Sequence, residues 1–318
     1  MLNAPAATPP GALDLTGDAA RRRRALQRGA VTVLERAGYE ELLPPTFEYE
    51  DTFLRAGGAG VAERLLRFPD RDGRILALRY DFTSSIARIA ATTFAGARPP
   101  LRLSYSGRVY RQEPERGGRP RETLQVGAEL LGEGSLQADV EIVRLTIELI
   151  RSAGLEDFQV NLGHVGVLAP GLAALEEPVR AQVRRWIDRK DRGGLTRALA
   201  ERTGAAATLL HLPFVIGRRE ALEAALGTTP APAIDGLRHL LALDSALGSS
   251  ERSHVVYDLG EVRGLDYYTG VHFEVFVSGT GRAAGAGGRY DELMGRFGRP
   301  MPAVGVSLDL DAIAEVPL

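Results

Sequence analysis

The chain has 318 residues, enough to bury a full hydrophobic core, and a formal net charge of -2 at pH 7. This balance gives no overall field that would draw the protein onto nucleic acid or an anionic membrane, so neither is expected as a partner. The sequence has no cysteine, and its five histidines lack close ligand spacing, so no metal site is expected. Because it has neither a signal-peptide pattern nor an apolar run of roughly 20 residues, we expect a cytoplasmic protein.

The first part of the chain predicts a helix followed by two strand-loop-strand units. After a leader rich in Pro, Gly and Ala, Asp18 is expected to cap a helix that ends at Gly38. Asp72-Gly73 separates two segments of alternating apolar and polar residues, which is typical of a tight hairpin. Residues 101–113 and 123–132 repeat this design around a loop rich in Gly and Arg.

The rest of the chain predicts a helical segment between two groups of strands. Residues 136–153 have helical periodicity, and residues 165–250 contain short amphipathic helices broken by prolines. Strands return after that segment, so we expect a core whose first part is 1–164 and whose last part is 251–318, with 165–250 as a helical insertion. Strands at both ends of the chain favour an α+β fold around an antiparallel sheet over a parallel βαβ arrangement.

One hairpin places four polar side chains where they could meet. Arg111 and Glu113 lie two residues apart on one predicted strand, and Gln125 and Glu129 lie four apart on the next. Carboxylate and amide oxygens accept from an ammonium group, and a guanidinium grips a carboxylate or phosphate, so this set suits a zwitterion. An exposed face with cross-strand salt bridges explains the same pattern equally well.

Two later motifs have less specific patterns. Residues 262–270, VRGLDYYTG, contain adjacent tyrosines, so one ring can pack while the other lines a pocket, although both are also compatible with core aromatics at a strand entry. Residues 285–298, GAGGRYDELMGRFG, are dense in glycine, which lets backbone approach a ligand closely. Their spacing is not that of a phosphate-binding loop or a dinucleotide fingerprint.

Six segments together resemble the catalytic domain of histidyl-tRNA synthetase, a class II aminoacyl-tRNA synthetase. They are GYEELLPPTFE, FPDRDGRILALRYDFT, YRQEPERGGRPRETLQVGAELLG, VRGLDYYTG, AGGRYDELMGRFG and PAVGVSLDLDAI. RGLDYY and AGGRYD are similar to the two signatures peculiar to the histidine enzyme. The resemblance implies an antiparallel sheet flanked by helices, and a homodimer formed through the segment that holds Pro45.

By position, the resemblance implies a histidine-binding site formed by Asp81, Thr83, Arg111, Gln125, Glu129, Arg263, Tyr267, Tyr268 and Tyr290. In it, Asp81, Thr83 and Gln125 would receive the α-ammonium. The imidazole would meet Glu129 and Tyr268, the two arginines would face the carboxylate or a phosphate, and the last tyrosine would close the pocket. The family has glutamate where this chain has Asp81, so that carboxylate is one methylene shorter here.

The ATP side departs further from the family. Thr123 stands where a phenylalanine stacks on adenine, Ala312 stands where an arginine covers it, and Asp309 replaces a glycine. Loss of a charge-stabilising donor costs roughly 3 to 4 kcal/mol in a transition state, so we expect activation of an amino acid to be reduced by several powers of ten. The sequence stops at Leu318, where a synthetase continues, so no anticodon-binding domain is expected.

Histidine signatures without an ATP site are the pattern of the regulatory subunit of ATP phosphoribosyltransferase. That resemblance implies a non-catalytic subunit without a cofactor, required by a short catalytic subunit and needed for feedback inhibition by histidine at the first step of histidine biosynthesis. It also implies a homodimer within a hetero-oligomer.

Two alternatives stay open. A truncated synthetase that activates histidine would keep Arg111, Glu113 and Arg263, and histidine-dependent pyrophosphate exchange distinguishes it. A nucleic-acid-binding module would use the arginines of residues 108–121, and its binding would weaken steeply with salt.

Overall fold

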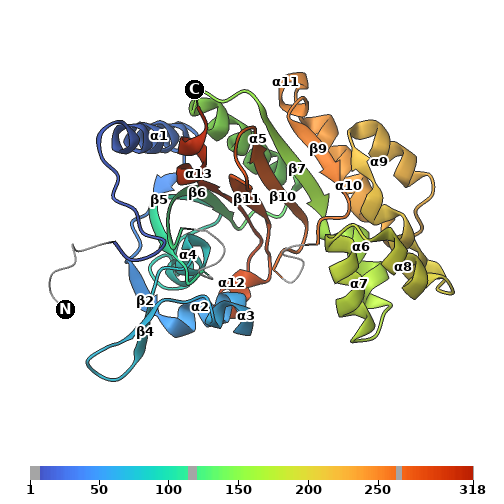
Figure 1. Cartoon of the computed structure of the whole chain (residues 1–318), viewed down its shortest axis with the longest axis horizontal. Helices are drawn as coiled ribbons and strands as arrows, with labels where there is room; N and C mark the ends of the chain where they lie inside the picture. Colours follow the sequence, from blue (N-terminus) through green and yellow to red (C-terminus); the bar gives the residue numbers. More distant parts are fainter. Residues whose placement is uncertain (1–7, 114–119, 263–266, 318) are drawn as a thin grey trace.

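The centre of the molecule is a twisted sheet that the computed structural model describes over residues 8–113, 120–262 and 267–317. Within these ranges the sheet has nine strands in the order β1-β5-β6-β12-β11-β10-β7-β9-β8 (Figure 1). The strands are β1 (Glu40–Glu41), β5 (Leu101–Tyr110), β6 (Glu122–Leu131), β7 (Phe158–His164), β8 (Ile216–Gly217), β9 (Val255–Asp258), β10 (Val271–Val277), β11 (Gly285–Arg289) and β12 (Ala303–Asp309). The expected α+β fold is confirmed, although the sheet is mixed: β1 with β5 and β7 with β9 pair in parallel.

Two expectations about local structure need correction. Helix α1 begins after Thr16, and Asp18 lies inside its first turn, so Asp18 is not the cap; Gly38, with φ of +81°, follows the helix as expected. Strand β5 ends at Tyr110, so Arg111 lies just beyond it, although its N–H still donates to the Arg121 carbonyl at 2.8 Å. The hairpin around Asp72-Gly73 is confirmed, with strands β3 (Arg67–Pro69) and β4 (Ile75–Leu78) paired antiparallel.

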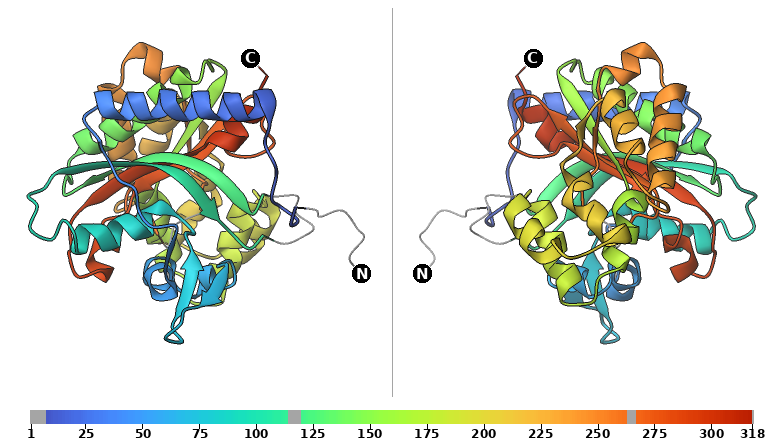
Figure 2. Two further views of the ribbon diagram at one scale, coloured as in Figure 1. Left: turned by 90° about the vertical axis from the view of Figure 1, so that its left-hand side faces the viewer. Right: turned by 90° about the vertical axis from the view of Figure 1, so that its right-hand side faces the viewer.

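Helices cover both faces of the central sheet (Figure 2). On one side lie α1 (Gly17–Arg36), α5 (Leu136–Ser152) and α13 (Leu310–Glu315). On the other lie α2 (Glu50–Gly57), α3 (Ala59–Ala62), α4 (Phe82–Ala91) and α12 (Leu293–Arg296), with a small sheet of β2 (Phe47–Tyr49), β4 (Ile75–Leu78) and β3 (Arg67–Pro69). Alternation along β6 divides its side chains: Val126 and Leu130 join the core under α1 and α5, whereas Leu131 packs in the cluster that includes α4.

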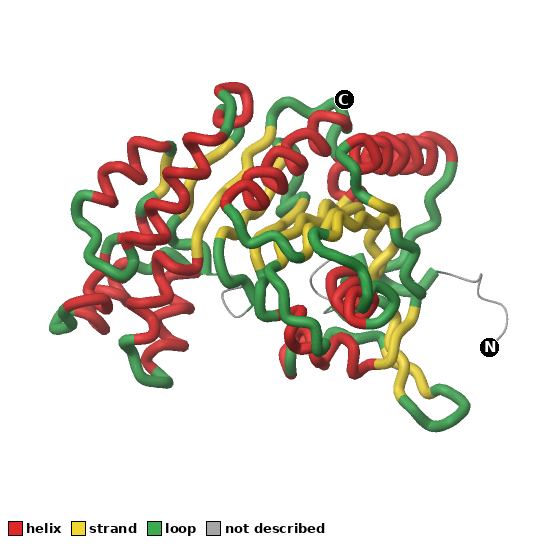
Figure 3. The backbone as a smooth tube through the Cα atoms, turned by 180° about the vertical axis from the view of Figure 1, so that it is seen from behind, coloured by secondary structure: helices red, strands yellow, loops and turns green. Residues whose placement is uncertain are grey.

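Residues between β7 and β9 contribute the edge strand β8 to the main sheet and otherwise form a group of helices beside it, visible from behind in Figure 3. They are α6 (Val165–Ala173), α7 (Val179–Asp188), α8 (Arg192–Leu199), the 3-10 turns Gly204–Leu210 and Leu212–Phe214, α9 (Arg219–Leu226), α10 (Ile234–Ala246) and α11 (Ser249–Arg252). Their buried leucines, such as Leu168, Leu209 and Leu240, belong to the same hydrophobic cluster as β6 and β7. The division into domains at residues 165 and 250 therefore stays a prediction. No helix in the described ranges is long and apolar enough to cross a membrane.

Candidate functional site

A row of glycines opens space on one face of the central sheet. Strand register places Glu129 opposite Gly305, Gly305 opposite Gly288, and Gly288 opposite His272. A β-carbon on Gly305 would lie 1.7 Å from Oε2 of Glu129, and one on Gly288, where φ is +151°, would lie 2.9 Å from the Tyr268 ring. Glycine is therefore needed at both positions, because the side chains of Glu129 and Tyr268 occupy that space.

A hollow of about 80 Å³ lies above this row. Thr83, Glu129, Tyr267, Tyr268 and Tyr290 line it. Glu129 accepts hydrogen bonds from the Thr83 hydroxyl at 2.7 Å and from the Tyr290 hydroxyl. The Tyr267 ring stacks on Tyr290 at 5.3 Å and meets Tyr268 edge-on at 5.2 Å between centroids. The result is an aromatic hollow with one carboxylate at its closed end.

Burial controls the protonation of that carboxylate. Glu129 is 1% exposed. Burial raises its pKa to about 7; the hydrogen bonds from Tyr290 and Thr83 oppose this shift, and the nearby Asp81 carboxylate adds to it. Asp81 itself caps α4 by accepting from the Ser84 N–H at 2.7 Å, and burial raises its pKa as well. Two carboxyl groups of raised pKa therefore lie near each other, which favours a ligand that brings positive charge or N–H donors.

A second, wider cavity of about 640 Å³ adjoins the hollow. Ala286 and Ser307 line both spaces, and Arg111 and Gln125 line the wider one. Among the described residues Arg111 has no ion-pair partner; its guanidinium lies 5.0 Å from the Tyr80 ring centroid, and its Nε is buried without a hydrogen bond. This guanidinium is therefore available to an anionic group in the cavity.

The four polar residues of the predicted hairpin do not all meet. Glu113 lines the wider cavity together with Arg111 and Gln125 but forms its ion pair with Arg64, at 2.5 Å, whereas Glu129 lines the hollow. Gln125 and Glu129 are 8% and 1% exposed, so the alternative of a solvated face with cross-strand salt bridges is wrong for them.

The implied histidine site is spread over these two adjoining spaces. Five of the nine predicted residues, Thr83, Glu129, Tyr267, Tyr268 and Tyr290, line the hollow. Arg111 and Gln125 line the wider cavity, and Asp81 lies close enough to Glu129 to influence its pKa. Arg263 lies outside the described residues.

The altered ATP positions have structural roles of their own. Thr123 and Asp309 line the wider cavity, whereas Ala312 is fully buried on α13. Asp309 caps α13 by accepting from the Ala312 N–H at 2.9 Å and also pairs with Arg282. A carboxylate therefore stands in the cavity wall where the family has glycine, and its charge is paired with Arg282.

Sequence reasoning missed several charged residues around the wider cavity. Arg64 and Arg282 contribute to its wall, where they pair with Glu113 and Asp309. No motif marks these positions, because their partners are distant in sequence. Within the part of the chain that the structure describes, no group of three or more His, Asp or Glu residues could hold a metal ion.

Comparisons with known proteins identify the fold and the family. The family model described as histidyl-tRNA synthetase matches residues 11–313. The ATP phosphoribosyltransferase regulatory subunit of Moorella thermoacetica is 40% identical over 320 residues, which cover 98% of this chain and 82% of that protein. The crystal structure of an ATP phosphoribosyltransferase regulatory subunit/histidyl-tRNA synthetase from Bacillus halodurans matches with a TM-score of 0.87 at 31% identity, over 97% of this chain and 82% of that one.

A more distant structure shares the fold. A chain of the ATP phosphoribosyl transferase (HisG:HisZ) complex from Thermotoga maritima matches with a TM-score of 0.70 at 21% identity, over 91% of this chain and 97% of that one. Near-complete coverage by the family model and by the Moorella relative means that the similarity is not confined to one motif. The chain thus belongs to the family of ATP phosphoribosyltransferase regulatory subunits, non-catalytic relatives of histidyl-tRNA synthetase.

Proposed function

We propose that this chain regulates a short-form ATP phosphoribosyltransferase catalytic subunit in the cytoplasm by binding free histidine in the two adjoining spaces. Histidine would act as the feedback effector at the first step of its own biosynthesis. One observation carries the proposal: Glu129, a buried carboxyl with a pKa of about 7, closes an aromatic hollow that adjoins a cavity lined by Arg111, which has no ion-pair partner among the described residues.

The chemistry of the hollow suits an imidazole. At neutral pH Glu129 is divided between its two protonation states, so it can accept from an imidazole N–H or donate to an unprotonated ring nitrogen. The rings of Tyr267 and Tyr268 supply apolar walls for the flat heterocycle.

The wider cavity suits the other end of the amino acid. Arg111 can pair with the α-carboxylate through charge-assisted hydrogen bonds. Gln125 and Asp81 offer acceptor oxygens to the α-ammonium. ATP is a poorer occupant, because Thr123 offers no ring to stack on adenine and the buried Ala312 stands where the family has a covering arginine.

An exposed apolar face supports the proposal that the chain is a homodimer within the larger complex. Phe47 on β2 and Phe68 on β3, the two outer strands of the small sheet, are 52% and 36% exposed and have ring centroids 6.0 Å apart. Tyr49 on β2 and Ile75 on the central strand β4 are also partly exposed, and Leu43, which precedes β2, is 82% exposed. A second copy of this chain would cover this apolar surface.

Titration of histidine into the full chain tests the pocket. We expect saturable binding by the parent, with weaker binding by Glu129→Ala and Tyr268→Phe. Glu201→Ala, a change at an exposed position in the helical segment, serves as the matched control and should bind as the parent does. Equal binding by all variants would show that histidine is sensed elsewhere.

Two activity measurements test the regulatory role. In the complex with the short catalytic subunit, inhibition by histidine should require higher histidine concentrations when the subunit carries Glu129→Ala. The chain alone should show no histidine-dependent pyrophosphate exchange; robust exchange would contradict the regulatory function and favour a truncated synthetase.

A further inference from the structure

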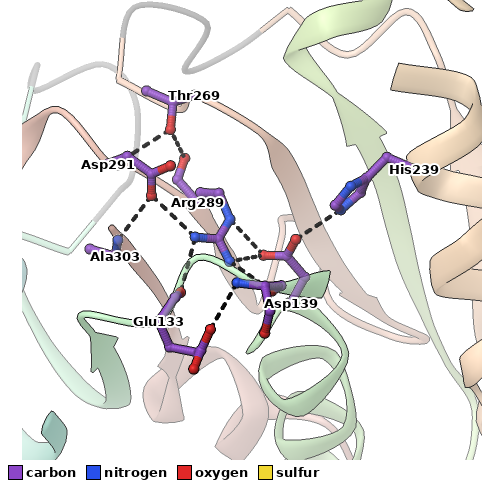
Figure 4. Close-up of polar contacts among 8 residues, drawn as sticks. Glu133, Asp139, His239, Thr269, Arg289, Asp291 and Ala303 are labelled. Atoms are coloured by element: carbon purple, nitrogen blue, oxygen red, sulfur yellow. Dashed lines mark hydrogen bonds and ion pairs between the residues drawn. The ribbon is translucent and has the colours of Figure 1, made fainter. Parts of the chain in front are cut away.

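We infer that Arg289, Asp139 and His239 form a positioning network that couples occupancy of the histidine pocket to helix α10. The inference rests on the proposed function, because it takes histidine as the ligand. Figure 4 shows this network between the segments that carry the pocket tyrosines and the helices behind the sheet.

Arg289 connects the pocket face of the sheet with the opposite face. Gly288 faces the pocket, and alternation along β11 turns the next side chain toward α5. There Arg289 donates to Oδ1 of Asp139 through Nε at 2.9 Å and Nη2 at 2.7 Å (Figure 4). The two residues are 7% and 1% exposed, so this ion pair lies inside the protein.

The same arginine belongs to a set of bonds that holds the pocket tyrosines. Thr269, which follows Tyr268, donates from its N–H to the Arg289 carbonyl at 2.7 Å, and its hydroxyl accepts from the Asp291 N–H at 3.0 Å. The Asp291 carboxylate accepts from Nη1 of Arg289 at 3.2 Å. Tyr290 lies between Arg289 and Asp291, so a ligand that repositions Tyr290 acts directly on both residues.

The other oxygen of Asp139 is bound to the helical segment. Nε2 of His239, on α10, lies 2.8 Å from Oδ2 of Asp139. A carboxylate paired with arginine is an acceptor, so His239 is the donor in this bond. The His239 ring lies 5.0 Å from that of His164, which caps α6 by accepting from the Gly166 N–H at 3.0 Å.

The neutral state of His164 preserves its role as the N-cap of α6. Burial, followed by the charge on His239, lowers the pKa of His164 to about 4, so its ring stays neutral and able to accept. Helix α10 therefore meets the network at a hydrogen bond, and the N-terminus of α6 meets it through the contact between the His164 and His239 rings.

Arg289 and His239 depend on each other, because both bind the one buried carboxylate of Asp139. If Arg289 moves away, Asp139 keeps a buried charge with only His239 to satisfy it, and loss of His239 leaves Oδ2 without its donor. A ligand that fixes the tyrosine segments thereby fixes Arg289 and Asp139, and stabilises the contact with α10. By linkage, the factor by which histidine favours the contact with α10 equals the factor by which loss of that contact lowers histidine affinity.

Amide hydrogen exchange of the full chain, with and without histidine, tests the coupling. In the parent, histidine should increase protection of residues 234–246. In His239→Ala that increase should be lost and histidine affinity should fall roughly 5-fold or more. His239→Gln should restore both, because its amide nitrogen can donate to the same oxygen. Arg238→Ala, an exposed neighbour on α10, is the matched control and should behave as the parent.

The outcomes separate the coupling from the pocket itself. If the parent does not bind histidine, the proposed pocket is wrong and the coupling falls with it. If the parent binds and His239→Ala shows the same affinity and the same gain in protection, the coupling alone is overturned. If His239→Ala does not fold, His239→Asn replaces it, because its shorter side chain cannot reach Asp139; equal behaviour of the Asn and Gln variants would then overturn the inference.

Discussion

Replacement of the buried Glu129 by glutamine should stabilise the free protein at alkaline pH while it weakens histidine binding. The folded-state pKa of Glu129 is about 7, above the ordinary value of 4.5. The folded state binds the proton of the Glu129 carboxyl more tightly than the unfolded state does. The stabilisation that this proton provides is therefore fully present below pH 4.5 and is lost as the pH rises through 7. The folded-state pKa exceeds the ordinary value by about 2.5 units, which corresponds to a loss of about 3 kcal/mol of the parent's unfolding free energy above pH 7.

Urea unfolding of the parent and of Glu129→Gln at pH 5 and pH 8 measures this effect. The variant should exceed the parent by about 3 kcal/mol at pH 8 and by about 1 kcal/mol at pH 5. Glutamine keeps the shape of the side chain, and the hydroxyls of Thr83 and Tyr290 can each donate or accept, so their hydrogen bonds can persist. A stability difference that is the same at both pH values, or a less stable variant at pH 8, would refute the reasoning.

Three further changes test the geometry of the site and of the dimer. Arg111→Ala should weaken histidine binding by roughly 10- to 100-fold in calorimetry, because a charge-assisted hydrogen bond is lost; an unchanged Kd would contradict the assigned role. Gly305→Ala should lower unfolding free energy by about 1 to 3 kcal/mol through its clash with Glu129, whereas Gly60→Ala, with open space around it, should not. Phe47→Asp should shift the chain toward monomer in light scattering; an unchanged mass would argue against the apolar face as the dimer contact.

Much of the local structure could be read directly from residue patterns. Asp72-Gly73 between alternating segments predicted a hairpin that the structure contains, since Gly73 takes the positive φ that such a turn needs. Periodicity predicted a helix over 136–153, and α5 spans Leu136–Ser152. The tyrosines of the two signature segments were expected near Glu129, and they line the hollow beside it.

What the sequence by itself determined was therefore the local elements, the family and the residue types of the pocket, because these depend on short-range patterns. Only the tertiary structure decided which charges meet. Glu113 pairs with Arg64, and Arg289 reaches Asp139 across a separation of 150 residues. No spacing rule predicts such pairs, since they depend on how strands and helices pack. The pKa of Glu129 has the same origin, because burial by distant elements raises it.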